Sequence, residues 1–194
     1  MIGEGGLPTD DREPLLAQSD EAIINSVLDG DVEDFAELVR RHRSRVYRVG
    51  LSWFHDREEA EDLVQDVFVK AFTKLASFRG ASLFSTWLLR IAYNTATSRK
   101  AAKREHEEYD PERSVDEGAG VEEGAMAAES AREVREALTH LSPEQALCVE
   151  LCFFQDLPYA EIAKVTGFPV NTIKSHVFRA KRILRERLSP GMEA

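Results

Sequence analysis

The residues best suited to bind a polyanion lie between 157 and 182, where two short helical patterns flank Gly167. In the second pattern Val170, Ile173 and Val177 can pack inward, which leaves polar and basic side chains outward. Lysine and arginine bind phosphates or guanine edges, and short polar side chains reach bases in the major groove. Two helices joined by a glycine turn are typical of a helix-turn-helix, so we expect DNA binding here, although a solvated basic helix has a similar composition. The outward residues expected at DNA are Asn171, Thr172, Lys174, Ser175, His176, Phe178, Arg179 and Arg182.

Charge is unevenly distributed along the 194 residues, whose formal net charge is −10 at pH 7. Residues 105–130 carry ten acidic residues against one basic residue, Arg113. By contrast, residues 79–104 hold six basic residues and no acidic one, and residues 169–188 hold six against Glu186. Counterion release at phosphates responds to local charge density, so an acidic chain with two basic segments can still bind nucleic acid.

Other functional classes find little support in the sequence. The two cysteines, Cys148 and Cys152, lie in an apolar helical pattern, which predicts buried thiols, with a redox role as the alternative. The five histidines lack metal-ligand spacing, and neither a phosphate-binding glycine loop nor a nucleophile elbow occurs. We therefore expect no enzyme activity, no metal and no cofactor. The absence of a long apolar run and of a signal-peptide pattern at the N-terminus predicts a cytoplasmic protein with no membrane insertion.

Apolar periodicity predicts helices and no strands, and therefore an all-α chain of two small helical domains joined by an acidic flexible linker. We expect a mobile tail over 1–16, a first domain over 17–104, the linker over 105–130 and a helix-turn-helix domain over 131–190. Helix starts are predicted by the cap Ser19 and by two capping boxes, Asp56 with Glu59 and Ser142 with Gln145. In the last of these helices, Leu147, Leu151 and Phe154 are expected to form the core stripe.

The helix expected after Asp56 is amphipathic. Its apolar stripe consists of Leu63, Val67, Ala71 and Leu75, with Val64, Phe68 and Phe72 beside it. Asp62, Gln65 and Asp66 face elsewhere, so a polar face is available for a partner. After a loop over 77–82, apolar periodicity restarts at Phe84, and the helix it predicts becomes basic toward Arg104.

Three segments carry a resemblance to a known family. PYAEIAKVTGFPVNTIKSHVFRAKRILRERL (158–188) resembles the promoter-binding second domain of bacterial sigma factors of the extracytoplasmic-function (ECF) type. AEDLVQDVFVKAF (60–72) resembles the helix by which that family binds the clamp helices of RNA polymerase. FRGASLFSTWLLRIAYNTA (78–96) resembles its promoter-opening segment. The resemblance covers about residues 17–100 and 130–190.

The resemblance implies roles for particular residues. Asp62, Gln65 and Asp66 would pair with arginines of the polymerase clamp. The loop Ser77–Ser82 would form a pocket for a base flipped out of the minus-ten element. Binding of the base in this pocket would offset the free energy needed to unpair and unstack it. The full set implied at the minus-ten element is Ser77, Phe78, Arg79, Gly80, Ala81, Ser82, Trp87, Arg90, Asn94, Arg99 and Lys100. A place for Trp87 in the core is the alternative, and Ala81 and His176 depart from the family's usual residues.

The resemblance implies a sigma factor that binds core RNA polymerase and both double-stranded and melted promoter DNA. It also implies control by an anti-sigma factor, in a stress or envelope response. The alternative is a stand-alone helix-turn-helix regulator that binds operator DNA without polymerase. The acidic linker either mimics nucleic acid inside polymerase or serves as a solubilising tether. We also hypothesise that it screens the basic helices when polymerase is absent.

Overall fold

The structure is a computed structural model and describes residues 18–109 and 136–188. The predicted tail over 1–16 lies outside the described residues. So do residues 110–130 of the predicted linker, and with them the hypotheses that it mimics nucleic acid or screens the basic helices.

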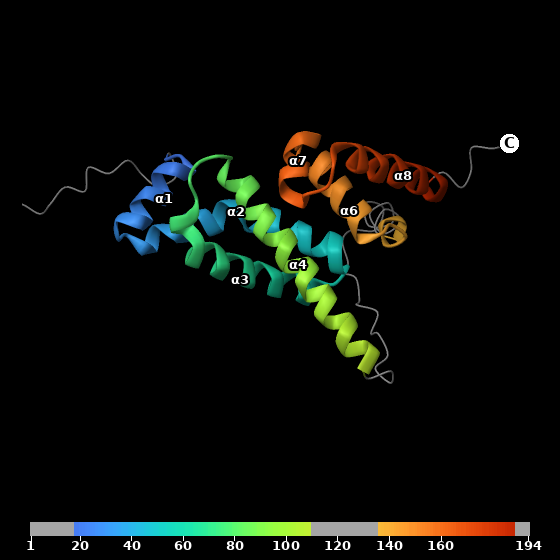
Figure 1. Cartoon of the computed structure of the whole chain (residues 1–194), viewed down its shortest axis with the longest axis horizontal. Coiled ribbons are helices and arrows are strands. Elements are labelled where there is room, and N and C mark those ends of the chain that lie inside the picture. The colour runs from blue at the N-terminus through green and yellow to red at the C-terminus, as the bar shows by residue number, and fades with distance from the viewer. Residues whose placement is uncertain (1–17, 110–135, 189–194) are drawn as a thin grey trace, which may run out of the picture. The chain divides into compact units, whose positions relative to one another are not determined.

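All regular elements within the described ranges are helical, as the all-α prediction requires (Figure 1). The N-terminal elements are α1 (Asp20–Asp29), the 3-10 turn η2 (Val32–Asp34), α2 (Phe35–Phe54), α3 (Arg57–Lys74), the 3-10 turn η3 (Leu75–Ser77) and α4 (Phe84–Tyr109). The C-terminal elements are α6 (Pro143–Val149), the π-helical turn η4 (Glu150–Phe154), α7 (Tyr159–Thr166) and α8 (Val170–Leu188). None of these helices is both long enough and apolar enough to cross a membrane. Contacts divide the chain into two units, one ending at Arg41 and one starting at His42.

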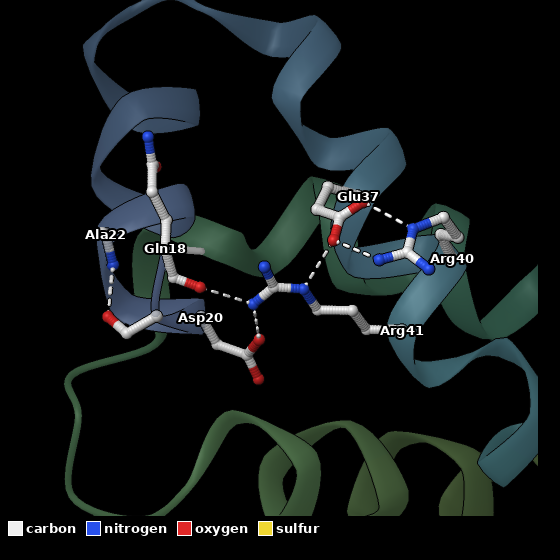
Figure 2. A network of polar contacts seen from close by, with 7 residues as sticks. Gln18, Asp20, Ala22, Glu37, Arg40 and Arg41 are labelled. Atoms are coloured by element: carbon white, nitrogen blue, oxygen red, sulfur yellow. Dashed lines mark hydrogen bonds and ion pairs between the residues drawn. The ribbon is translucent and has the colours of Figure 1, made fainter. Parts of the chain in front are cut away.

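An ion-pair network around Glu37 holds the first unit together (Figure 2). Arg40 Nε and Nη2 each donate to the Glu37 carboxylate at 2.7 Å, and Arg41 Nε donates to the same group at 2.7 Å. Arg41 Nη1 also binds the Asp20 carboxylate at 3.0 Å and the Gln18 carbonyl at 2.8 Å, which ties the start of α1 to the first turns of α2. Hydrogen bonds from Arg40 and Arg41 lower the pKa of Glu37 to about 2.

The predicted helix caps are confirmed at three starts. The Ser19 hydroxyl accepts from the Ala22 amide at 3.2 Å, and Ser142 and Gln145 form a reciprocal capping box. Asp56 Oδ1 accepts from the Glu59 amide at 2.8 Å. The Glu59 carboxylate binds Lys103 Nζ at 2.7 Å, however, so the second half of the expected Asp56–Glu59 box is replaced by an ion pair to α4.

Helices α2 and α3 approach closely at Gly50. A Cβ at this position would lie 2.8 Å from Ala60 Cα and 2.9 Å from Ala60 Cβ, closer than real Cβ contacts. The predicted apolar stripe of α3 is buried, with Leu63, Val67, Ala71 and Leu75 all at most 2% exposed, and Val64 and Phe68 beside it are buried as well. The prediction was wrong for Phe72, which is 45% exposed; it lies in the last turn of α3.

The C-terminal helices enclose a second core. Leu141, Ala146, Val149 and Ala180 form a buried cluster. Leu147 and Leu151 are fully buried as predicted, but Phe154 is 56% exposed. The difference has a physical cause: residues 150–154 form a π-helical turn, whose extra residue shifts the phase of the stripe.

Helix α4 runs to Tyr109, five residues beyond the boundary at 104 that the sequence predicts for the first domain. The five added residues, EHEE followed by Tyr109, contain good helix formers and no glycine or proline.

Candidate polymerase and nucleic-acid interfaces

The helix-turn-helix is built as its residue types predict, except that Val170, expected to pack inward, is 38% exposed at the first position of α8. Gly167 has φ 77°, a left-handed conformation that ends α7, and its amide donates to the Ala163 carbonyl at 2.8 Å. Ile162 of α7 and Ile173 and Val177 of α8 are buried. They leave an outward face on α8 whose exposed members are Asn171, Lys174, Ser175, Phe178, Arg179 and Arg182.

Two predicted DNA contacts, Thr172 and His176, are only partly exposed. The His176 ring lies 5.6 Å from that of Phe168 in the turn, with 37° between the planes. Its Nδ1 is buried and makes no hydrogen bond to the described residues. His176 thus packs on the turn that orients α8, and a contact from it to DNA stays a prediction.

An aromatic cluster supports the loop that precedes α4. Phe78 lies 5.7 Å from Phe84 in an edge-on arrangement and 5.4 Å from Trp87. Phe84 is 1% exposed and belongs to the core, whereas Trp87 is partly exposed at the border between core and surface. A core role and a contact to DNA are therefore both compatible with the place of Trp87.

The remaining predicted minus-ten residues lie mostly at the surface. Ser77, Arg79, Gly80 and Ala81 are exposed, as are Arg90 and Asn94 one turn apart on α4, while Ser82 is partly exposed. Gly80 has φ 68°, so the loop turns where glycine is favoured. Leu83, next to this loop, is 63% exposed and was missed from the sequence. It lies one residue before Phe84, where the helical periodicity restarts, and this position outside the apolar stripe could have indicated its exposure.

The polar face of α3 continues into an apolar patch that sequence reasoning missed. Asp62 and Gln65 are exposed, and Val69 and Phe72 follow them at helical spacing with 62% and 45% of their surfaces exposed. We call these four residues the α3 stripe. An exposed stripe that is polar at one end and apolar at the other is suited to binding another protein.

Asp66, the third predicted polymerase contact, is paired with Arg99, a predicted DNA contact. Arg99 Nε and Nη2 donate to Asp66 Oδ2 at 3.0 Å and 2.5 Å, and Nη2 also donates to the Asp62 carbonyl at 3.1 Å. α3 and α4 lie side by side here (Figure 1), and the Glu59–Lys103 pair joins them nearby. Lys100, also predicted at DNA, has its Nζ 5.7 Å from the centre of the Trp53 ring.

The described residues contain no group of three His, Cys, Asp or Glu side chains placed to hold a metal ion. Cys148 is buried as predicted, whereas Cys152 is only partly buried. Burial raises the pKa of the Cys148 thiol to about 12. A thiol with so high a pKa is almost wholly protonated at neutral pH and is a poor nucleophile.

Two family models match the two helical regions in order. The model described as Sigma-70 region 2 matches residues 38–106, and the model described as Sigma-70, region 4 matches residues 131–184. The first match contains the α3 stripe and the loop before α4, and the second contains the helix-turn-helix. The chain thus combines, in order, the two helical regions of the Sigma-70 class.

Full-length relatives specify the family. The chain is 30% identical over 185 residues to the ECF RNA polymerase sigma-E factor of Haemophilus influenzae, covering 90% of this chain and 97% of that protein. It is 31% identical over 183 residues to the factor of the same name from Escherichia coli K12, covering 89% and 95%. A solved structure of the sigma factor RpoE with the anti-sigma factor NepR from Bartonella quintana matches with a TM-score of 0.72 and 26% identity, covering 81% of this chain and 98% of that one. The chain belongs to the ECF sigma factor family, which favours the sigma-factor reading over a stand-alone regulator.

Proposed function

We propose that this ECF sigma factor joins core RNA polymerase through α3, reads the minus-thirty-five element with α8, and opens the minus-ten element with residues 77–104. The observation that carries the proposal is that three surfaces each expose a different set of side chains. The α3 stripe, the loop before α4 and the outward face of α8 each expose the side chains that their role requires.

The polymerase contact is assigned to the α3 stripe together with Asp66. Acidic and amide oxygens at Asp62 and Gln65 can accept hydrogen bonds from arginines of a polymerase clamp. Val69 and Phe72 add apolar surface that becomes buried when the partner binds, and such burial is a main source of affinity. Charged residues then determine orientation and association rate more than total affinity.

The minus-thirty-five contact is assigned to α8. Lys174, Arg179 and Arg182 are exposed on one face, and Asn171 and Ser175 lie among them. The Ser175 hydroxyl donates to the Asn171 carbonyl at 2.9 Å and retains acceptor capacity. Arg182 is 3.8 Å from Glu186 in a solvent-exposed pair, which is weak enough for a phosphate to displace.

Promoter opening is assigned to the loop and the first turns of α4. Capture of an unpaired base would offset the few kcal/mol that unstacking costs, so opening needs no nucleotide hydrolysis. The aromatic cluster of Phe78, Phe84 and Trp87 fixes the loop, while exposed Arg79, Arg90 and Asn94 are available to nucleic acid. We assign no catalytic role and no cofactor to the chain.

The proposal also covers a regulatory partner, a physiological response and a cellular location. We propose that an anti-sigma factor controls this chain, supported by the similarity to a sigma factor solved with the anti-sigma factor NepR. We also propose a role in a stress or envelope response, supported by the sigma-E factors among the relatives. Because its proposed partner is bacterial RNA polymerase, we place the chain in the cytoplasm.

A gel-mobility experiment tests the proposal against the stand-alone regulator. Labelled promoter fragments are mixed with the protein alone, with core polymerase alone, and with both. The expected result is a heparin-resistant complex only when both are present. A specific complex formed by the protein alone at physiological salt would refute the proposal, because an operator-binding regulator needs no polymerase.

A further inference from the structure

The pair between Asp66 and Arg99 joins a residue proposed to bind polymerase to one proposed to bind promoter DNA. We propose that each masks the other in the free protein, so that polymerase, by engaging Asp66, releases Arg99 for a DNA phosphate. The inference rests on the proposed function and adds a residue-level coupling between its two binding events.

The geometry makes the two uses of Arg99 exclusive. Its Nε and Nη2 both donate to Asp66 Oδ2, and Nη2 is shared with the Asp62 carbonyl. A guanidinium offers two edges for bidentate binding of a phosphate: Nε–H with one N–H of Nη2, and Nη1–H with the other N–H of Nη2. Asp66 occupies the first edge, and the donation from Nη2 to the Asp62 carbonyl competes for the second. Arg99 therefore cannot bind a phosphate with two hydrogen bonds while it holds both the Asp66 carboxylate and the Asp62 carbonyl.

The same contact limits Asp66. One of its two oxygens, Oδ2, accepts both hydrogen bonds from Arg99. The charge of the carboxylate is offset by the adjacent guanidinium, so a clamp arginine meets a weaker field than an unpaired acid would present. Binding of polymerase to Asp66 and retention of Arg99 thus compete for one group.

The pair is accessible enough to exchange. The Arg99 side chain is 31% exposed and that of Asp66 is 45% exposed. Ion pairs at such positions change an equilibrium constant by a factor of about two to five, which an incoming partner can overcome. Glu59 and Lys103 join the same two helices, so α3 and α4 keep a connection when Arg99 leaves.

Thermodynamic linkage distinguishes masking from a purely structural pair. If the contact couples polymerase binding to DNA binding, removing the charge of Asp66 strengthens DNA binding, and removing the charge of Arg99 strengthens polymerase binding by a similar factor. A pair that only fastens α4 to α3 would behave differently. Its loss would loosen both surfaces, so the affinities for polymerase and for DNA would fall or stay unchanged.

The DNA arm uses the free full-length protein and a fluorescent non-promoter duplex at 50–200 mM salt. Asp66→Asn is compared with Glu58→Gln, which removes one charge from an exposed residue on α3 that has no ion pair among the described residues. We expect Asp66→Asn to bind about two- to five-fold more tightly than Glu58→Gln. Its log-log salt slope should be steeper by about 0.9, which corresponds to one additional phosphate contact. The gain must vanish in Asp66→Asn/Arg99→Gln; if it persists there, a general change in charge explains it and the inference fails.

The polymerase arm measures binding of core enzyme in the absence of DNA. Arg99→Gln is compared with Arg57→Gln, which removes an exposed cation from the first residue of α3. We expect Arg99→Gln to bind core about two- to five-fold more tightly than this control. Thermal melts of every variant verify folding. Equal or weaker binding by folded Arg99→Gln would overturn the inference.

The two proposals fail differently. If the unchanged protein does not bind core at all, the proposed function fails, whereas the DNA arm still reports whether Asp66 masks Arg99. If the unchanged protein binds core and both arms match their controls, the proposed function stands and the coupling is refuted.

Discussion

Gly50 controls how closely α2 and α3 pack, and Gly50→Ala tests that spacing. An added Cβ would lie 2.8 Å and 2.9 Å from the Cα and Cβ of Ala60, whereas ordinary contacts begin near 3.4 Å. The helices must therefore separate by roughly half an ångström or more along this contact. Overpacking of this kind costs about 1–3 kcal/mol, against a gain of up to about 1 kcal/mol because alanine favours helix over glycine.

We expect Gly50→Ala to lower the free energy of unfolding by about 1–2 kcal/mol. For a domain the size of the predicted first domain, over 17–104, that is a fall in Tm of roughly 4–15 °C. The assay is a thermal and urea melt followed by circular dichroism. Gly50→Ala/Ala60→Gly is the matched variant: it removes the Ala60 Cβ but keeps the closer Cα, so its loss of stability should be smaller than the sum of the losses of the two single variants. A single variant as stable as the unchanged protein, or a double variant less stable than the sum of the singles, would refute the reasoning.

Three further predictions address the interfaces, the ion-pair network and a cap. Asp62→Arg with Gln65→Ala should abolish binding in a core-polymerase pull-down with folding intact, whereas Lys174→Ala with Arg179→Ala should keep polymerase and lose the minus-thirty-five footprint; equal behaviour contradicts the division of labour. Because the pKa of Glu37 is lowered from 4.5 to about 2, its stabilisation is complete above pH 4.5 and is lost as the pH falls toward 2. Glu37→Gln should therefore be the less stable protein at neutral pH, with melts that converge on those of the unchanged protein near pH 2; a constant gap would argue against the network. Asp56→Ala should cost about 1 kcal/mol in a urea melt by removing the cap of α3, and an unchanged midpoint would contradict that cap's role.

Local features of this fold were predictable from sequence. Ser19, Asp56 and Ser142 each accept a hydrogen bond from a backbone amide three residues later. The residues that predict each cap are therefore the same residues that form it. Gly167 ends α7 in the left-handed conformation that glycine adopts most readily. Such positions depend little on the rest of the chain.

Features that depend on tertiary context were not predictable. Phe154 follows a π-helical turn, which ordinary helical periodicity does not anticipate, so its expected burial was wrong. Glu59 has a capping-box position, but its carboxylate binds Lys103, 44 residues away. The Asp66–Arg99 pair likewise joins residues 33 positions apart. Sequence assigned both residues to interfaces and gave no indication that they contact each other.

Run-off transcription tests the central claim most directly. Purified core polymerase is supplied with a library of bacterial upstream fragments, with and without this protein, and the transcripts are sequenced. We expect new start sites that depend on the protein and share two elements at fixed spacing. Lys174→Ala with Arg179→Ala should weaken the choice of the upstream element only. Transcripts identical with and without the folded protein, while it binds core, would contradict promoter recognition by this chain.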